Sequence, residues 1–131
     1  MENKNIKVAI LGVGNCASSF VQGIEYYSNS DNEDGLISDL IGGYKVSDIE
    51  IVAAYDINES KVGKDLSEAI FAEPNNTLKF SEVPSTGVIV EPGVVKDGVG
   101  KFVKDIIKTS PDSKNFEDSL KNSGAEILIN L

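Results

Sequence analysis

The stretch Val8-Ala9-Ile10-Leu11-Gly12-Val13-Gly14-Asn15-Cys16-Ala17 joins a short apolar run to a turn of the form G-x-G-x-x-A. The apolar run, residues 6–11, has the β-type residues on both faces that are typical of a buried parallel strand. After the turn, apolar residues recur three and four positions apart, which predicts one face of a helix. They are Phe20, Val21, Ile24 and Tyr27. A strand, a glycine turn and a helix in this order form the phosphate-binding entry to a dinucleotide-binding fold.

Three residues of this turn have separate expected roles. Gly12 allows a tight turn, Gly14 has no Cβ to collide with an approaching diphosphate, and Ala17 lets the helix pack close to the sheet. The unpaired N–H groups at the start of the helix would stabilise the phosphate charge by about 0.3–1 kcal/mol beyond their direct hydrogen bonds. The sequence therefore predicts that bare main-chain amides hold the diphosphate. The alternative is a tight connection between strand and helix that binds nothing.

A second predicted strand, residues 49–55, ends at Asp56. The Asp56 carboxylate would accept hydrogen bonds from the hydroxyls of an adenosine ribose, each worth roughly 1.5–3 kcal/mol. Its charge would repel a 2′-phosphate, so NAD is favoured over NADP. The separation between Gly14 and Asp56 is longer than the usual ~20 residues, and the polar stretch at residues 28–47, expected to be an exposed loop, accounts for the excess. The alternative role of Asp56 is to cap the following helix.

Beyond Asp56 the pattern continues to alternate between helices and strands. Asn58 is expected to cap a helix that runs to Ile70, and Asp97 a helix that runs to Ile107. A shorter helix passes through Phe116 and Leu120, with Gly124 just after its end. Short strands are expected at residues 88–90 and 125–131. The alternation predicts an α/β fold, a Rossmann-like parallel sheet with flanking helices.

Composition bounds the possible partners. The length of 131 residues suits one domain, and 12 basic against 21 acidic residues give a net charge of -9. Such a charge disfavours nucleic acid and anionic membranes as partners. No apolar run is long enough for a signal or membrane segment, so a soluble cytoplasmic protein is expected.

The sequence has no histidine, which removes the commonest general base and the commonest transition-metal ligand. Cys16 is the only cysteine, so an intrachain disulfide is impossible. It lies in the first helical turn, where a thiolate could be stabilised, although a packing role is favoured. No metal ligand is assigned.

Blocks along nearly the whole chain resemble the archaeal and bacterial myo-inositol-1-phosphate synthases, also called inositol-3-phosphate synthases. The blocks are VAILGVGNCASS (8–19), VQGIEYY (21–27), IGGYKVSDI (41–49), AAYD (53–56), KVGKDLSEAI (61–70) and PNNT (74–77). The family comprises NAD-dependent isomerases that convert glucose 6-phosphate to 1D-myo-inositol 3-phosphate by internal oxidation, aldol cyclisation and reduction, in inositol and phospholipid biosynthesis. The resemblance implies positions at the cofactor for Gly12, Val13, Gly14, Asn15 and Cys16 (diphosphate segment), Asp56 (adenosine ribose), and Asn76 and Thr77 (a following loop).

The departure from the family is one of length. The family continues past residues 127–131 into a second half, which carries the sugar-phosphate site, the catalytic lysines and most of the tetramer contact. Residues 1–131 are therefore expected to be an amino-terminal NAD-binding fragment, with an incomplete sheet and an inserted polar loop at 28–47. We assign no catalytic residue, and expect glucose 6-phosphate to bind only the full-length enzyme, a homo-oligomer.

Two other interpretations stay open. One is a fragment of an NAD-dependent sugar or homoserine-type dehydrogenase, whose first strand looks similar. The other is a stand-alone nucleotide-sensing or interaction module, in which the apolar residues at 36–41 would form the interface.

Overall fold

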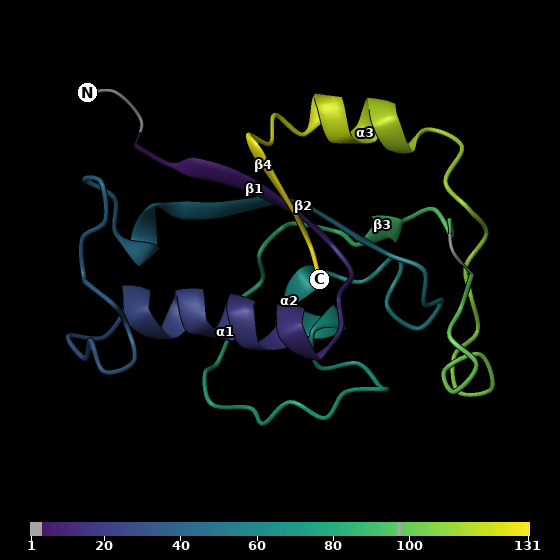
Figure 1. Ribbon diagram of the computed structural model, residues 1–131, viewed down its shortest axis with the longest axis horizontal. Helices are drawn as coiled ribbons and strands as arrows, with labels where there is room; N and C mark the ends of the chain where they lie inside the picture. The colour runs from purple at the N-terminus through teal and green to yellow at the C-terminus, as the bar shows by residue number, and fades with distance from the viewer. Residues whose placement is uncertain (1–3, 97) are drawn as a thin grey trace.

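The computed structural model describes residues 4–96 and 98–131. It contains a parallel four-stranded sheet with helices on both faces (Figure 1). The strands are β1 (Ile6–Leu11), β2 (Ile49–Asp56), β3 (Glu91–Pro92) and β4 (Ile127–Asn130), in the order β3-β2-β1-β4. Helices α1 (Asn15–Ser28) and α2 (Leu66–Ala69) cover one face and α3 (Phe116–Asn122) covers the other. A 3-10 turn, η1 (Val46–Asp48), leads into β2. The predicted Rossmann-like α/β fold is confirmed.

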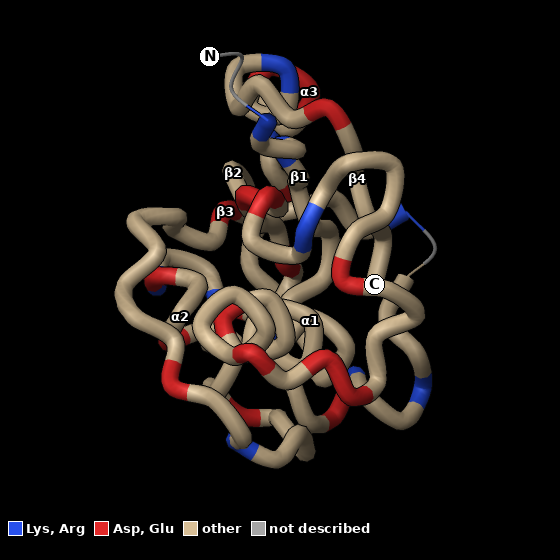
Figure 2. The backbone as a smooth tube through the Cα atoms, turned by 90° about the vertical axis from the view of Figure 1, so that its left-hand side faces the viewer, with Lys and Arg blue, Asp and Glu red and all other residues tan. Residues whose placement is uncertain are grey.

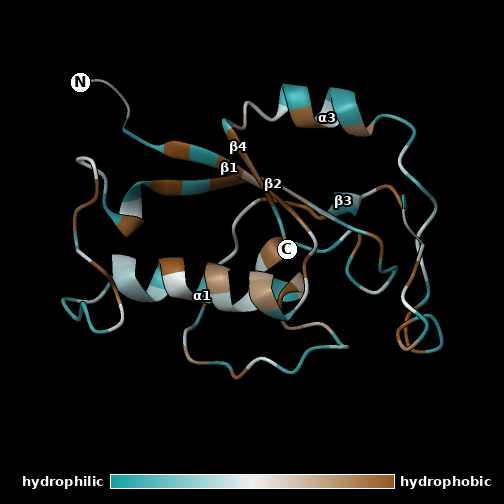
Figure 3. Cartoon of the chain, viewed as in Figure 1, coloured by the Kyte–Doolittle hydropathy of each residue, from teal (hydrophilic) through white to brown (hydrophobic). Residues whose placement is uncertain are grey.

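The sheet separates two apolar layers, because successive side chains of a strand point to opposite faces. Val8 and Ile10 of β1 pack on the face covered by α1 and α2. Ala9 of β1 and Tyr55 of β2 pack on the opposite face, under α3. Figure 3 shows hydrophobic residues running along β1, β2 and β4. The central position of β1 places the end of this strand, and the turn that follows it, in the middle of the sheet.

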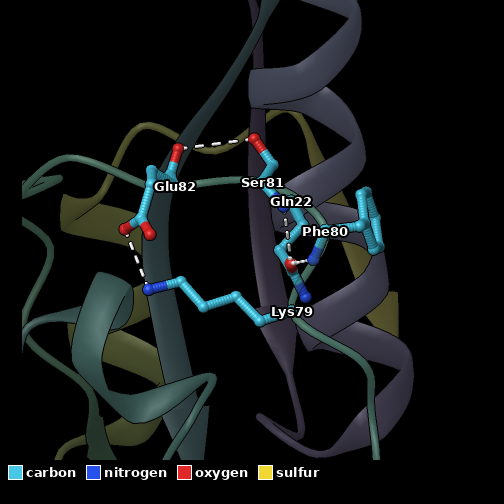
Figure 4. A network of polar contacts seen from close by, with 5 residues as sticks. All are labelled: Gln22, Lys79, Phe80, Ser81 and Glu82. Atoms are coloured by element: carbon cyan, nitrogen blue, oxygen red, sulfur yellow. Dashed lines mark hydrogen bonds and ion pairs between the residues drawn. The ribbon is translucent and has the colours of Figure 1, made fainter.

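The buried amide of Gln22 fastens a distant loop to α1 (Figure 4). Its Oε1 accepts hydrogen bonds from the backbone amides of Phe80 (2.8 Å) and Ser81 (3.2 Å). Its Nε2 donates to the carbonyl oxygen of Leu78 at 3.3 Å. Residues 78–81, which follow the loop at residues 73–77, are therefore held against α1.

Tyr55 joins α3 to the sheet. Its ring meets that of Phe116 edge to face, with 4.8 Å between centroids, and its hydroxyl lies 2.8 Å from Oγ of Ser119. Ser119 also donates to the carboxylate of Glu91 in β3. Burial raises the pKa of the Tyr55 hydroxyl. The side chain of Ser119 thus links α3 to β2 and β3, which are far from it in sequence.

The prediction that a helix begins after Asn58 is wrong. Asn58 instead closes a turn, in which its Oδ1 accepts from the amide of Ser60 at 3.0 Å. Gly63 has a φ of +87°, a left-handed conformation that interrupts a helix. The helix α2 begins only at Leu66, after Asp65, whose side chain caps it through the amide of Ser67.

The helix expected at residues 97–107 does not form in the described part of this segment, and its expected cap, Asp97, lies outside the described residues. Residues 101–106 make turns instead. The apolar face that the pattern predicted is exposed, with Phe102 at 78% and Ile106 at 66%. A short helix depends on packing of its apolar face, and this one has no surface beneath it. The strand expected at 88–90 is also displaced, to Glu91–Pro92.

Candidate nucleotide-binding site

The glycine turn lies at the point where the strand order reverses. From β1 the chain passes to β2 and β3 on one side of the sheet, and β4 pairs with β1 on the other. In open α/β sheets ligands bind in the crevice beyond the carboxyl ends of the strands at this point. The residues predicted for the cofactor lie at or beside this end of the sheet.

Gly12 is required by two independent constraints. Its φ is +100°, and a Cβ at this position would collide with the carbonyl oxygen of Leu131. The amide of Leu131 donates to the carbonyl of Leu11 at 2.8 Å, which holds the two chain segments together. Gly12 therefore lets the end of β4 close against the turn.

Gly14 has a different environment. Its φ of -100° and ψ of -150° are open to any residue, and no atom lies within 4 Å of the position of a Cβ. Gly14 is also the N-cap residue of α1, and no side chain in the described residues caps this end of the helix. The start of α1 thus offers main-chain donors and free space together, which is the combination that an anionic ligand needs.

Asp56 faces the turn and is bonded to it. Its Oδ2 accepts a hydrogen bond from the amide of Val13 at 2.6 Å, and its Oδ1 accepts from the amide of Asn58 at 2.7 Å. The amide of Gly12 is bonded as well, to the carbonyl of Tyr55 at 2.7 Å. The prediction of bare amides is thus wrong for Gly12 and Val13, because the adjacent strand already occupies them. The candidate phosphate donors are those from Gly14 onward, at the start of α1.

The loop at residues 75–77 docks on the first residue of α1. The backbone amide of Asn76 donates to Oδ1 of Asn15 at 2.9 Å, and the hydroxyl of Thr77 donates to the Asn15 carbonyl at 3.0 Å. Asn75 closes the loop by accepting from the amide of Thr77 at 3.0 Å. The structure therefore brings Asn76 and Thr77 beside the turn, 61 and 62 residues away from Asn15 in sequence.

Cys16 is exposed at the start of α1. The packing role that the sequence favoured for it is therefore wrong. The small residue that packs here is Ala17, which is fully buried in the layer between α1 and the sheet.

A buried lysine near Asp56 is absent from the sequence-based prediction. Lys61 is 2% exposed, and its ammonium group donates to the carbonyl of Ala69 at 3.2 Å. Burial lowers the pKa of Lys61, and the negative charge of Asp56 opposes this shift. The sequence signal was obscured because Lys61 fell on an expected helix, where a lysine is ordinarily exposed.

The wider surroundings are acidic. Figure 2 shows acidic residues distributed over the loops around α1 and α2, in line with the net charge of -9. Among the described residues, no group of three or more His, Cys, Asp or Glu is placed to hold a metal ion. Within the same residues, none of the helices has the length and apolar character that a membrane span requires.

Comparison with known proteins supports the family resemblance. No family model matches the chain. An inositol-3-phosphate synthase of Mycolicibacterium smegmatis (strain ATCC 700084 / mc(2)155) is 48% identical over 128 residues, which cover 95% of this chain and 35% of that protein. By sequence, the chain is related to the inositol-3-phosphate synthases.

Two solved structures are similar to this chain over nearly its whole length. The crystal structure of Ari2 superposes with a TM-score of 0.74 at 34% identity, over 97% of this chain and 37% of the other. A myo-inositol-1-phosphate synthase-related protein from Thermotoga maritima MSB8 gives a TM-score of 0.67 at 26% identity, over 96% of this chain and 34% of the other. The chain spans about a third of the length of its inositol-3-phosphate synthase relatives.

Proposed function

We propose that this chain is the NAD-binding part of an inositol-3-phosphate synthase. The diphosphate of NAD lies at the amino end of α1, and the adenosine ribose lies on Asp56. The observation that carries the proposal is the position of the Asp56 carboxylate, 2.6 Å from the amide of Val13 and thus at the turn that leads into α1.

The residues present fit such a ligand. Gly14 leaves open the space into which a Cβ would project, and α1 offers uncapped main-chain donors at the same place. Each oxygen of the Asp56 carboxylate accepts one hydrogen bond from a backbone amide and keeps a second lone pair for a ribose hydroxyl. The ligand would therefore share the acid with the backbone rather than displace it.

The proposed activity belongs to the whole enzyme. It converts D-glucose 6-phosphate to 1D-myo-inositol 3-phosphate, an isomerisation that serves inositol and phospholipid biosynthesis. NAD, when bound, accepts a hydride from the sugar and later returns it. Residues 1–131 act as an NAD-binding domain, with the polar loop at 28–47 inserted between α1 and β2. The sugar-phosphate site and the main oligomer contacts are assigned to the remaining two thirds of the enzyme, so residues 1–131 alone are expected to be inactive. The whole enzyme is expected to act in the cytoplasm.

The interpretations as a dehydrogenase fragment and as a nucleotide-sensing module share this NAD site and differ in chemistry. The similarity to an inositol-3-phosphate synthase and to a synthase-related protein favours the synthase. A dehydrogenase would consume NAD in proportion to substrate, whereas an isomerase returns it. Absorbance of NADH during turnover by the full-length protein distinguishes a dehydrogenase from an isomerase.

Calorimetric titration of NAD tests the site. We expect weak binding to the wild-type chain and affinity reduced roughly tenfold or more by Asp56→Ala, since hydrogen bonds to a charged group are lost. Glu68→Gln, which removes an exposed carboxylate on α2, is the control and should match wild type. Absence of binding to the wild-type chain would refute the proposal, and equal affinities for wild type and Asp56→Ala would remove Asp56 from the site.

A further inference from the structure

One charged side chain is buried, and neither the proposed diphosphate contact nor the proposed ribose contact uses it. Lys61 is 2% exposed, and within residues 4–96 and 98–131 no other acidic or basic side chain lies in the buried interior. Removal of an ammonium group from water is costly unless the group is hydrogen-bonded and acted on by an opposite charge. The contacts of Lys61 therefore have to balance this cost.

Two features of its surroundings favour the charged form of Lys61. Its Nζ donates to the carbonyl of Ala69 at 3.2 Å, at the last residue of α2. Carbonyls in the last turn of a helix carry partial negative charge, so they favour a cation there. Burial lowers the pKa of Lys61, and the charge of the Asp56 carboxylate counteracts this effect. The acid of the proposed nucleotide site is therefore the opposite charge that acts on the buried ammonium group.

One short turn joins Lys61 to Asp56. Oδ1 of Asp56 accepts from the amide of Asn58 at 2.7 Å, and the Asn58 carbonyl accepts from the amide of Lys61 at 3.0 Å. From the same turn, Oγ of Ser60 donates at 2.8 Å to the carbonyl of Glu73, which precedes the loop that docks on α1. The bond from Lys61 to α2 thus anchors, from the interior, a turn that holds the Asp56 carboxylate at its other end.

We propose that Lys61 is a positioning residue of the nucleotide site, which fastens the turn after Asp56 to α2 and offsets part of the negative charge that Asp56 presents to a ligand. This inference rests on the proposed NAD site and extends it to a residue that touches no part of the nucleotide. A 2′-phosphate would lie against the Asp56 carboxylate, whereas the diphosphate lies at the start of α1. Loss of the Lys61 charge should therefore weaken NADP binding more than NAD binding, because repulsion between like charges grows as their separation falls.

Calorimetric titrations of the intact chain with NAD and NADP, at constant ionic strength, test this role. Lys61→Met removes the charge and keeps an unbranched side chain. We expect it to weaken NAD binding roughly threefold and NADP binding roughly tenfold or more, so that the preference for NAD rises. Lys64→Met is the matched control, because Lys64 is exposed, lies three positions away and loses the same charge. It should bind both nucleotides as wild type does.

A double variant with Asp56→Asn separates an electrostatic role from a structural one. Without the Asp56 charge, Lys61→Met should no longer change the ratio of NAD affinity to NADP affinity. Binding like that of Lys64→Met, an equal loss of both nucleotides in Lys61→Met, or the same change of ratio in the Asp56→Asn background would overturn the role of Lys61 alone.

Circular dichroism and urea denaturation check that each variant is folded. Lys61→Gln, which is neutral and retains an N–H donor, replaces Lys61→Met if methionine prevents folding. Failure of both neutral variants to fold would make Lys61 a requirement of the fold itself and would refute its role at the site. Failure of the wild-type chain to bind NAD would refute both proposals.

Discussion

The amide nitrogen of Val13 lies 2.6 Å from Oδ2 of Asp56, a hydrogen bond between the turn after β1 and the end of β2. The two residues are 43 positions apart, and parallel pairing of their strands brings them together. This bond orients the acid toward the turn and holds the two halves of the proposed site in register, which lowers the ordering cost of binding.

The two glycines of the turn should respond in opposite ways to the same substitution. Gly12→Ala places a side chain at a φ of +100° and against the Leu131 carbonyl, so it should lower the free energy of unfolding by about 1–3 kcal/mol or more. Gly14→Ala meets no atom within 4 Å and should change stability by less than about 0.5 kcal/mol, while it weakens NAD binding. Urea denaturation and calorimetry measure the two effects. A Gly14→Ala variant that binds NAD like wild type would place the phosphates elsewhere.

Asp56 should set the preference between NAD and NADP. A 2′-phosphate would approach its carboxylate, and such like-charge contact is costly, so NAD should bind at least about tenfold more tightly than NADP. Asp56→Asn keeps an acceptor for the amide of Val13 but removes the charge. The ratio of the two affinities, measured by competition at constant ionic strength, should fall toward one in this variant. A ratio that does not change would mean that another group rejects the phosphate.

The carboxylate of Asp65 should make the chain sensitive to acid. It accepts hydrogen bonds from Ser67, Ser85, Thr86 and Gly87, which joins the start of α2 to a distant loop. Partial burial alone would raise the pKa of Asp65, but the bonds from Ser67 and Thr86 outweigh this effect and hold the pKa well below its usual range. A lowered folded-state pKa means that this stabilisation is complete above the unfolded-state value of about 3.9 and is lost as the pH falls below it.

Denaturation at pH 7 and pH 3 measures this dependence. Asp65→Ala should cost about 1–2 kcal/mol at pH 7, as expected for a lost N-cap, and less at pH 3. Glu68→Gln, on the exposed side of the same helix, serves as the control. An equal cost of Asp65→Ala at both pH values would contradict the charge-based explanation.

Figure 4 pairs a buried amide with an exposed ion pair, and the two should differ in their contribution to stability. Gln22→Met leaves the amides of Phe80 and Ser81 without their acceptor and should cost about 2 kcal/mol. Lys79→Ala removes a 2.8 Å ion pair with Glu82, in which the side chains are 50% and 87% exposed, and should cost less than about 0.5 kcal/mol. Urea denaturation ranks the two variants, and limited proteolysis near residue 80 should increase only in Gln22→Met. The reverse ranking would show that the loop is held by charge.

The parts of the fold that could be predicted are those whose signals are local. The apolar run before Gly12 and the helical spacing after it place β1 and α1 correctly, and Asp56 ends β2 as predicted. Gly124, with a φ of +71°, follows α3 at the expected position. In each case the strand or helix can be read from neighbouring residues, without knowledge of what lies across the core.

The errors depend on contacts that no local pattern contains. The amide of Val13 was expected to be bare, since the sequence does not show that Asp56 bonds to it. The periodicity around Ile106 has the helical form, but there is no surface for that face to cover. The burial of Lys61 and the placement of segment 106–110 beside Asp56 likewise depend on tertiary contacts. The predicted loop at Asn76 and Thr77 lies at the turn, and its role toward NAD stays a prediction.

The pairing of β1 with β4 has a consequence for the order of assembly. Lys7 and Glu126, which are 119 residues apart, are bonded at this edge, and Leu131 closes on Gly12 at its end. During synthesis, β1 and β2 can pair long before β4 leaves the ribosome, so one edge of the central strand stays open until then. Contacts of such long sequence separation form late and slowly. This end of the sheet therefore gains the wall that β4 forms only after β1 and β2 have paired, and ligand binding would report on the docking of β4.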